Sequence, residues 1–182
     1  NEVLPLGDIF EISQGVVEAS DKIPSKALRS NQYSSSFQVG QGVFVLSQDE
    51  VENLKLNSEE LRYIKKYIDP NDVEKYYINL NSSKYLIYSD GLLKQKIEKD
   101  ANFKNLKAHL QTMQPFITSS NKPYGLHRPR KSKFFEKEKI VFKGMFSKPE
   151  FDLDEFQLYF GMSFSSIIKK DKEYSLNTCL EY

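Results

Sequence analysis

Apolar residues recur at helical spacing in one stretch near the middle of the chain. They follow one another at intervals of three, four and three residues, at Phe103, Leu106, Leu110 and Met113. Such intervals place side chains on one face of a helix. The pattern predicts a helix from about Asp100 to Met113, ended by Pro115. Two heptads are too few to predict a coiled coil, so this face is expected to pack into an ordinary core.

Two shorter helices are predicted before this one. The sequence Ser-Gln-Asp-Glu at residues 47–50 has the form of a capping box, whose first and last residues satisfy backbone N–H groups at a helix start. Residues 58–67 are the second candidate. Apolar residues recur there and just beyond at helical spacing, at Leu61, Ile64 and Ile68. Asp69-Pro70 is expected to end this helix, because a residue before proline disfavours the helical conformation.

Short runs rich in β-branched and aromatic residues predict strands. In the first half these runs are Val43–Leu46 and Tyr85–Tyr88, the second closed by the turn dipeptide Asp90-Gly91. Four further runs lie in the second half, at residues 140–142, 151–153, 156–160 and 162–168. Residues 6–12 alternate roughly between apolar and polar and predict a short strand or turn leading into Gly15. This order of elements predicts an α+β fold with a mixed, mainly antiparallel sheet and a few helices.

The composition is that of a globular protein. Hydrophobic residues make up 39% and charged residues 28% of 182 residues, with a net charge of +1, so disorder is not expected. The length fits a single domain over residues 1–182. Apolar runs are too short to cross a membrane. The single cysteine, Cys179, excludes an internal disulfide and fits a cytoplasmic location.

The two ends of the sequence favour a domain cut from a longer protein. The chain begins at Asn1 rather than at a methionine. A helix is predicted to begin near Ser175, because Leu176 and Cys179-Leu180 follow it at helical spacing. We expect this helix to continue beyond Tyr182, so that part of the parent protein's function lies outside this chain.

Motifs of the common catalytic sites are absent from the sequence. The chain has no nucleotide-binding P-loop, no dinucleotide fingerprint and no Gly-x-Ser-x-Gly elbow. Two histidines and one cysteine are too few for a Cys/His zinc site. Asp152 and Asp154 share one face of a strand, but such a pair is mostly a solvated strand edge. We therefore predict no enzyme activity, no catalytic residue, no metal and no cofactor for this chain itself.

Charge is unevenly distributed along the sequence. Residues 122–148 hold nine Lys and Arg against two Glu, a net charge of +7. Since the whole chain carries +1, the remaining residues carry −6. A local basic segment on a neutral protein is typical of a surface that binds phosphates. The alternative is a solvated loop with charged strand edges.

The centre of the basic segment is the sequence Tyr-Gly-Leu-His-Arg-Pro-Arg at residues 124–130. Pro129 restricts the backbone between Arg128 and Arg130. An arginine can fork onto the O6 and N7 atoms of guanine or onto a phosphate. Tyr124 can stack on a base or donate a hydrogen bond. These residue types close together favour binding to nucleic acid.

In three places the sequence resembles the TaqI-like C-terminal specificity domain of bacterial DNA methyltransferases and of fused restriction-modification enzymes. The first is the opening Leu-Gly-Asp-Ile-Phe-Glu-Ile-Ser-Gln-Gly-Val at residues 6–16. The second is the strand and capping box at 43–50, followed by 61–70 and the strand at 85–88. The third is residues 124–142, where an aromatic residue, His-Arg-Pro-Arg and a strand entered by Lys-Ile follow in that order. The resemblance covers nearly the whole chain.

The resemblance implies a target-recognition domain that grips double-stranded DNA and reads its sequence. The parent protein would be an adenine-specific DNA methyltransferase, whose separate catalytic domain binds S-adenosylmethionine and flips the target adenine out of the duplex. In such enzymes the catalytic motif is Asn-Pro-Pro-aromatic, which does not occur here. The expected partners are therefore DNA and the catalytic domain, and no membrane. A nuclease domain in the same parent is compatible with this family.

Three groups of site residues follow from this hypothesis. Candidates for reading base edges are Gln14, His127, Arg128 and Arg130. Glutamine can pair bidentately with adenine, and Gly15 would allow the backbone to approach closely. Candidates for phosphate contacts are Lys122, Lys131, Lys133, Lys137 and Lys139. Tyr124 is expected to stack, where the family often has tryptophan.

Two other hypotheses remain open at this stage. One is a target-recognition domain of a type I restriction specificity subunit, which reads DNA but belongs to a separate chain. The other is an α+β domain that binds another protein and no DNA. Binding to random duplex DNA would separate this last hypothesis from the first two.

Overall fold

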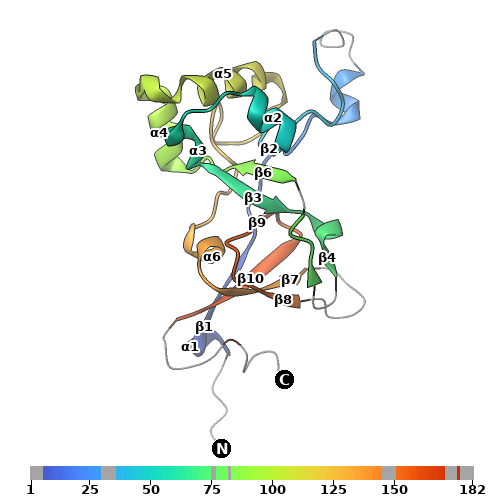
Figure 1. Ribbon diagram of the computed structural model, residues 1–182, viewed down its shortest axis with the longest axis vertical. Helices are drawn as coiled ribbons and strands as arrows, with labels where there is room; N and C mark the ends of the chain where they lie inside the picture. Colours follow the sequence, from blue (N-terminus) through green and yellow to red (C-terminus); the bar gives the residue numbers. More distant parts are fainter. Residues whose placement is uncertain are drawn as a thin grey trace, which may run out of the picture. The chain divides into compact units, whose positions relative to one another are not determined.

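The computed structural model describes residues 6–29, 36–74, 77–81, 83–144, 151–170 and 176 (Figure 1). It contains helices and two mainly antiparallel sheets, which confirms the predicted α+β class. Within the predicted single domain, the chain divides into two compact units. Unit 1 consists of Asn1–Gly15, Ile68–Ser82 and Arg130–Tyr182, and unit 2 consists of Val16–Tyr67 and Ser83–Pro129. Each unit is therefore assembled from separate stretches of the sequence.

Unit 1 is built on a four-stranded antiparallel sheet in the order β1-β10-β7-β8. Its strands are β1 (Phe10–Gln14), β7 (Lys139–Lys143), β8 (Phe151–Asp154) and β10 (Phe164–Lys169). The register places Ile12 opposite Ile167 and Ile167 opposite Ile140. Opposite residues share a face of a sheet, so these three side chains form an apolar row. Ile140 of this row is buried together with Phe10 and Leu176.

Short elements complete unit 1. They are α1 (Leu6–Ile9), the turn η2 (Pro70–Asp72), the paired strands β4 (Val73–Glu74) and β5 (Tyr77–Ile78), α6 (Lys133–Glu136) and β9 (Tyr159–Phe160). The predicted strand or turn at residues 6–12 is thus one helical turn followed by a strand. The predicted strands of the second half are all present, although the run at 156–160 is extended only at its last two residues.

Aromatic rings form the centre of unit 1. The Phe135 ring, on α6, stacks on the Tyr159 ring with 4.5 Å between centroids, and it meets the Phe160 ring edge-on at 5.1 Å. Phe160 in turn meets Phe164 of β10 edge-on. All four side chains are fully buried. Such ring pairs add about 0.5–1.5 kcal/mol each beyond their buried area, so α6 is fixed to the sheet by these contacts.

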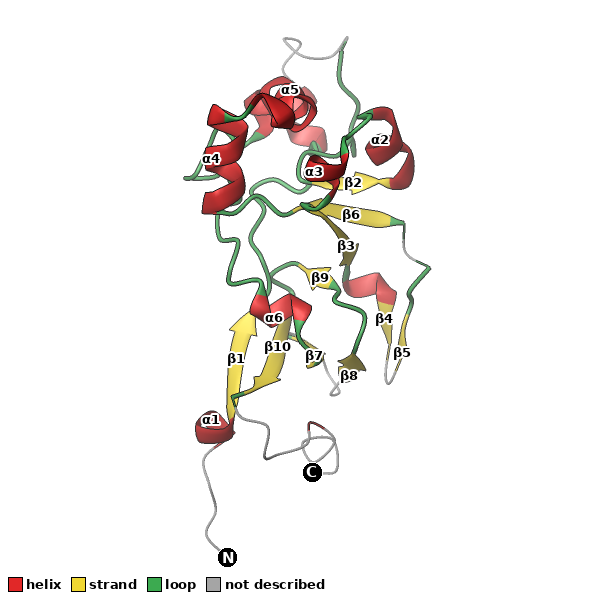
Figure 2. Ribbon diagram, turned by 60° about the vertical axis from the view of Figure 1, so that its left-hand side comes forward, coloured by secondary structure: helices red, strands yellow, loops and turns green. Residues whose placement is uncertain are grey.

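Unit 2 holds a second antiparallel sheet and most of the helices. Strand β6 (Lys84–Ile87) pairs with β2 (Val45–Ser47) and with β3 (Ile64–Ile68). The helical elements are η1 (Ser25–Leu28), α2 (Gln48–Asn53), α3 (Ser58–Leu61), α4 (Gly91–Lys99), η3 (Ala101–Phe103), α5 (Lys104–Thr112) and η4 (Gln114–Phe116). Figures 1 and 2 show α2, α4 and α5 on the same side of these strands.

Two of the predicted helices are confirmed. Ser47 caps α2 by accepting a hydrogen bond from the Glu50 N–H, while the Glu50 carboxylate accepts one from the Ser47 N–H. The apolar stripe of α5 is buried as predicted, and the 3₁₀ turn η4 contains Pro115. Both predictions rest on interactions between residues close in sequence.

The predicted helix at residues 58–67 is wrong beyond its first turn. Only Ser58–Leu61 is helical, and Leu61 is 47% exposed. The following residues form β3, where Ile64 lies opposite Ile87 of β6. β-branched residues favour an extended backbone, and pairing with a strand that lies later in the sequence decides the conformation here.

Asp90-Gly91 was predicted to be a turn, and it is the start of helix α4. The Asp90 carboxylate accepts hydrogen bonds from the N–H groups of Leu92 and Leu93. Leu93 and Ile97 bury the inner face of this helix. A capping residue and a turn residue have similar sequence signatures, since Asp and Gly serve both.

Some sequence predictions fall outside the described residues. They are the helix expected near residue 175 with Cys179, and the turn at Asp171-Lys172. Phe146 and Lys148 of the basic segment also lie outside them. Among the helices that the structure describes, none has the length and apolar character that a membrane crossing requires.

Candidate nucleic-acid interface

The end of β1 forms a tightly packed corner in unit 1. The Gly15 N–H donates to the Phe164 carbonyl oxygen at 2.9 Å. A Cβ placed on Gly15 would lie 2.5 Å from the Phe160 carbonyl oxygen, which is closer than real contacts allow. Only glycine fits at this position. In this structure the backbone that comes close to Gly15 is that of the neighbouring turn, and the expected approach to DNA stays a prediction.

Arg130 is bound to this corner from the other end of the sequence. Its Nε donates to the Gly15 carbonyl oxygen at 3.2 Å, and its Nη2 donates to the Gln14 Oε1 at 3.3 Å. The Arg130 backbone has a φ of 61°, in the left-handed region that few non-glycine residues adopt. Two hydrogen bonds and an uncommon backbone conformation together set the direction of the guanidinium group.

The Gln14 amide group links Arg130 to a turn. While its oxygen accepts from Arg130, its Nε2 donates to the Met162 carbonyl oxygen at 2.9 Å. A glutamine amide has two donors and two acceptor sites, so half of its capacity is used within the protein. In this arrangement Gln14 positions Arg130, and the predicted bidentate pairing of Gln14 with adenine would require these bonds to change.

Basic side chains surround this corner unequally. Lys131 and Lys137 are exposed, and their role as phosphate contacts stays a prediction. Lys133 is half-buried: its Nζ contacts both carboxylate oxygens of Glu11 at 2.7 and 2.6 Å and lies 5.1 Å from the Phe134 ring centroid. This ion pair holds the pKa of Glu11 below its usual value, chiefly through the hydrogen bond from Lys133. Glu11 therefore occupies the position that a phosphate would take on Lys133.

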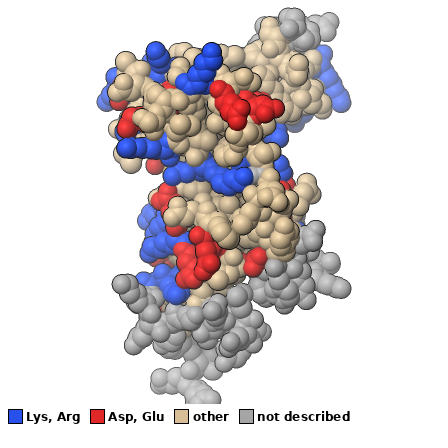
Figure 3. All heavy atoms as spheres, viewed as in Figure 1, with Lys and Arg blue, Asp and Glu red and all other residues tan. Residues whose placement is uncertain are grey.

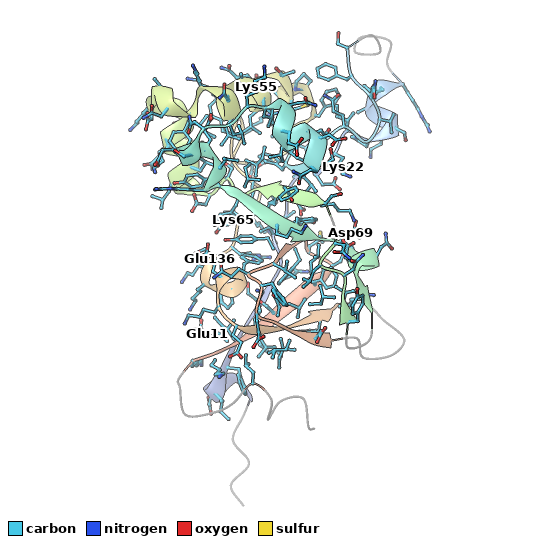
Figure 4. All side chains as sticks on the ribbon, in the orientation of Figure 1. Glu11, Lys22, Lys55, Lys65, Asp69 and Glu136 are labelled. Atoms are coloured by element: carbon cyan, nitrogen blue, oxygen red, sulfur yellow. The ribbon has the colours of Figure 1, made fainter. Side chains whose placement is uncertain are left out.

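Figures 3 and 4 show charged side chains of unit 1. Figure 4 labels Glu11 on β1 and Glu136 on α6. Figure 3 shows Lys and Arg side chains gathered beside acidic ones on the side of unit 1 that carries α6. Acidic groups next to the basic ones reduce the local positive potential, so the surface is less basic than the sequence segment suggests.

Lys139 is a correction to the predicted phosphate contacts. Its side chain is fully buried and forms an ion pair with Asp154, which is also fully buried. The Lys139 Nζ also donates to the Phe135 carbonyl oxygen. Burial lowers the pKa of Lys139, against the opposite effect of Asp154. Lys139 therefore presents no charge to DNA, and Asp154 does not belong to a solvated strand edge.

The other predicted residues lie in unit 2. Arg128 and Lys122 are exposed. The Arg128 backbone forms a two-way bridge with Val17, its N–H donating at 3.1 Å and its carbonyl accepting at 3.0 Å. His127 is half-buried, and its Nδ1 lies 3.1 Å from the Ser120 Oγ. The backbone of this segment is fixed, while the Arg128 and Lys122 side chains face solvent.

Tyr124 is a second correction. Its ring is 7% exposed, and its hydroxyl accepts a hydrogen bond from the Gln111 Nε2 at 3.3 Å. A buried ring offers no face to a base, so the predicted stacking role is not met in this structure. Instead Tyr124 anchors the loop whose turn is closed by the Asn121 Nδ2, which donates to the Leu126 and His127 carbonyl oxygens.

Comparison with known proteins leaves the site to be interpreted from its own chemistry. No protein-family model matches the chain, and no curated protein is similar enough to count as a relative. Within the described residues there is no group of three or more His, Cys, Asp or Glu side chains that could hold a metal ion. What remains is hydrogen-bond donors and cations on the surface of each unit, which suit the recognition of an anionic partner.

The Met162 turn and the Glu11 ion pair were not found from the sequence. The sequence pattern placed Met162 in the predicted strand at 162–168, whereas it lies in the turn before β10. Glu11 lies more than a hundred residues from Lys133, so their pairing depends on the sheet. The only available signal was an acidic residue between the apolar Phe10 and Ile12.

Proposed function

We propose that this chain is the DNA-recognition part of a restriction-modification methyltransferase. It binds double-stranded DNA, reads a specific sequence and positions the target adenine for a separate catalytic domain of the parent protein. That domain, not this chain, would bind S-adenosylmethionine and carry out the methylation. The proposal includes a cytoplasmic location, where such an enzyme meets its DNA.

The orientation of Arg130 is the observation that carries this proposal. Hydrogen bonds to Gln14 and Gly15 hold the guanidinium group at the tightly packed corner where only glycine fits at position 15. An arginine that is fixed before binding loses less conformational entropy when it forks onto guanine. A left-handed backbone at a non-glycine residue costs about 1–3 kcal/mol, and backbone strain of this kind clusters at functional sites. Both features are uncommon for a surface arginine that is merely solvated.

The exposed cations supply the second part of the proposal. Lys131 and Lys137 in unit 1 and Lys122 in unit 2 are the predicted phosphate contacts that remain exposed. About three phosphate contacts should weaken DNA binding about 40-fold between about 50 and 200 mM salt. Five contacts would have given about 500-fold, so the buried Lys139 and the paired Lys133 lower the expected salt dependence.

The experiment first selects a preferred sequence from random duplex DNA at low salt and then measures binding by fluorescence anisotropy. Arg130→Ala should reduce the ratio between the affinities for the selected and for a scrambled duplex, because it removes a base contact. Lys131→Ala, the matched neighbour, should weaken both duplexes about equally. Absence of binding at about 50 mM salt would contradict the proposal and favour a protein-binding domain.

A type I specificity module would give the same result in this assay. The two are separated by adding the parent protein's remaining domains, since a methyltransferase in the same chain methylates adenine in the selected duplex when S-adenosylmethionine is supplied. Methylation that depends on a separate subunit would favour the type I module.

A further inference from the structure

A hollow of about 520 Å³ opens in unit 1 next to the Gln14–Arg130 corner. It is lined by Gln14, Pro70, Lys143, Gly144, Met162 and Ser163, and its exposed lining is mostly apolar. Its volume lies in the range of small-molecule sites, about 300–1,000 Å³. Mostly apolar walls with a few polar groups are the usual form of a site for a heterocyclic ligand.

One wall of the hollow is a rigid turn that exposes an apolar side chain. The turn is closed by the Phe164 N–H, which donates to the Gly161 carbonyl oxygen at 3.1 Å. The Met162 carbonyl accepts from Gln14 and the Ser163 carbonyl from the Gly144 N–H. Three hydrogen bonds thus fix the turn, while the Met162 side chain is 55% exposed.

The groups around the hollow match the parts of a nucleotide. A methionine sulfur makes favourable contacts with aromatic rings, and Pro70 offers a second apolar surface for a base. The Gln14 amide can hydrogen-bond to the edge of a base. Lys143 brings a cation for the phosphate. Asp69, labelled in Figure 4, marks the start of the η2 turn that carries Pro70.

We propose that this hollow binds one nucleotide that has left the base stack of the duplex, with Met162 packing against its base. This inference rests on the proposed function and specifies the ligand of the same surface. A fixed apolar side chain next to a pocket is suited to this role, because an unstacked base regains on the protein part of the stacking that it loses in DNA.

The test compares a fully paired duplex of the selected sequence with a series of duplexes. Each duplex of the series carries one unpaired 2-aminopurine nucleotide at a different position of the site. At one position we expect the unpaired duplex to bind about tenfold more tightly than the paired duplex. The 2-aminopurine should there be protected from quenching by acrylamide when the protein is bound.

Met162→Ser should abolish both the tenfold preference and the protection, because the preference depends on the apolar side chain that packs on the base. Met162→Leu keeps an apolar side chain and should retain most of the preference. Leu92→Ser, which changes an exposed apolar residue on α4 of unit 2, is the control and should alter neither. Met162 is exposed, so folding is expected to be unaffected.

Two results would overturn the inference in different ways. Equal binding of the paired and unpaired duplexes, or an equal loss of both in Met162→Ser, would leave the proposed function standing and remove the nucleotide site. Absence of binding to either duplex at low salt would remove both.

Discussion

Lys139 and Asp154 form an ion pair in which both side chains are fully buried. They lie opposite each other on β7 and β8 of unit 1. The Asp154 carboxylate also accepts hydrogen bonds from the N–H groups of Phe156 and Leu158. The pair therefore joins two strands and the loop that follows, which explains why a lysine in the basic segment contributes nothing to the surface.

Removing the cation of this pair should destabilise unit 1. Lys139→Met keeps a long side chain but leaves the Asp154 carboxylate buried without its counter-ion, which costs about 3–5 kcal/mol. Chemical denaturation followed by far-ultraviolet circular dichroism measures the loss in the free energy of unfolding. Lys137→Met, two residues earlier and exposed, should change the free energy of unfolding by less than about 0.5 kcal/mol. Equal effects of the two changes would contradict the importance of the pair.

Gly15→Ala should destabilise the corner that holds Arg130. The added methyl group would meet the Phe160 and Gly161 carbonyl oxygens, and backbone cannot move aside as easily as a side chain. Overpacking of this kind costs about 1–3 kcal/mol. Gly7→Ala is the control, because a Cβ there meets nothing within 4 Å. A Gly15→Ala protein as stable as the Gly7→Ala protein would show that the corner is not tightly packed.

The stability of unit 2 should depend on the protonation of Glu18. Burial raises the pKa of this carboxyl above 4.5, despite the hydrogen bond of 2.7 Å from the Tyr67 hydroxyl. The folded state then binds the proton more tightly than the unfolded state. Its contribution to stability is therefore full below pH 4.5 and is lost as the pH rises through the folded-state pKa.

Glu18→Gln removes this titration and keeps an oxygen for Tyr67. The variant should gain stability relative to the wild type as the pH rises from about 4.5 to neutrality. The measurement is the free energy of unfolding at several pH values, with Glu98→Gln on the exposed face of α4 as control. A difference between Glu18→Gln and wild type that stays constant with pH would contradict the prediction.

The carboxylate of Glu11 should weaken DNA binding, because it forms an ion pair with the Lys133 ammonium group that a phosphate would otherwise contact. Glu11→Gln leaves Lys133 available for a phosphate, so affinity should rise and the slope of log affinity against log salt should steepen by about 0.9. Binding titrations at several salt concentrations test both changes. Glu155→Gln, an exposed change elsewhere in unit 1, controls for the added net charge. An equal gain in both variants would indicate a general charge effect rather than the release of Lys133.

Local sequence signals predicted local structure well. The Ser47–Glu50 capping box and the apolar stripe of α5 depend on residues within one or two turns, and both were found. The helix predicted over Ile64 was wrong, because a short apolar pattern fits a helix or a strand until the partner strand is known. The sequence named Gln14 and Arg130 separately as base contacts. Their hydrogen bond spans more than a hundred residues and could not be predicted from either segment alone.

Burial also distinguishes residues for which the sequence predicted the same role. Lys137 and Lys139 are two positions apart on the same basic segment, yet one is exposed and the other buried. The difference follows from the register of β7 against β8, which places Lys139 opposite Asp154. A composition-based charge count cannot make this distinction, since it assumes that every charge reaches the surface.

The hydrogen bond between Arg130 and Gly15 also has a topological meaning. The chain leaves the first segment of unit 1 after Gly15 and returns to its last segment at Arg130, so the exit and the return are neighbours in space. Between these two points the chain does not stay in unit 2, because residues 68–82 belong to unit 1. The chain therefore crosses between the two units four times, so neither unit can be replaced as one continuous segment.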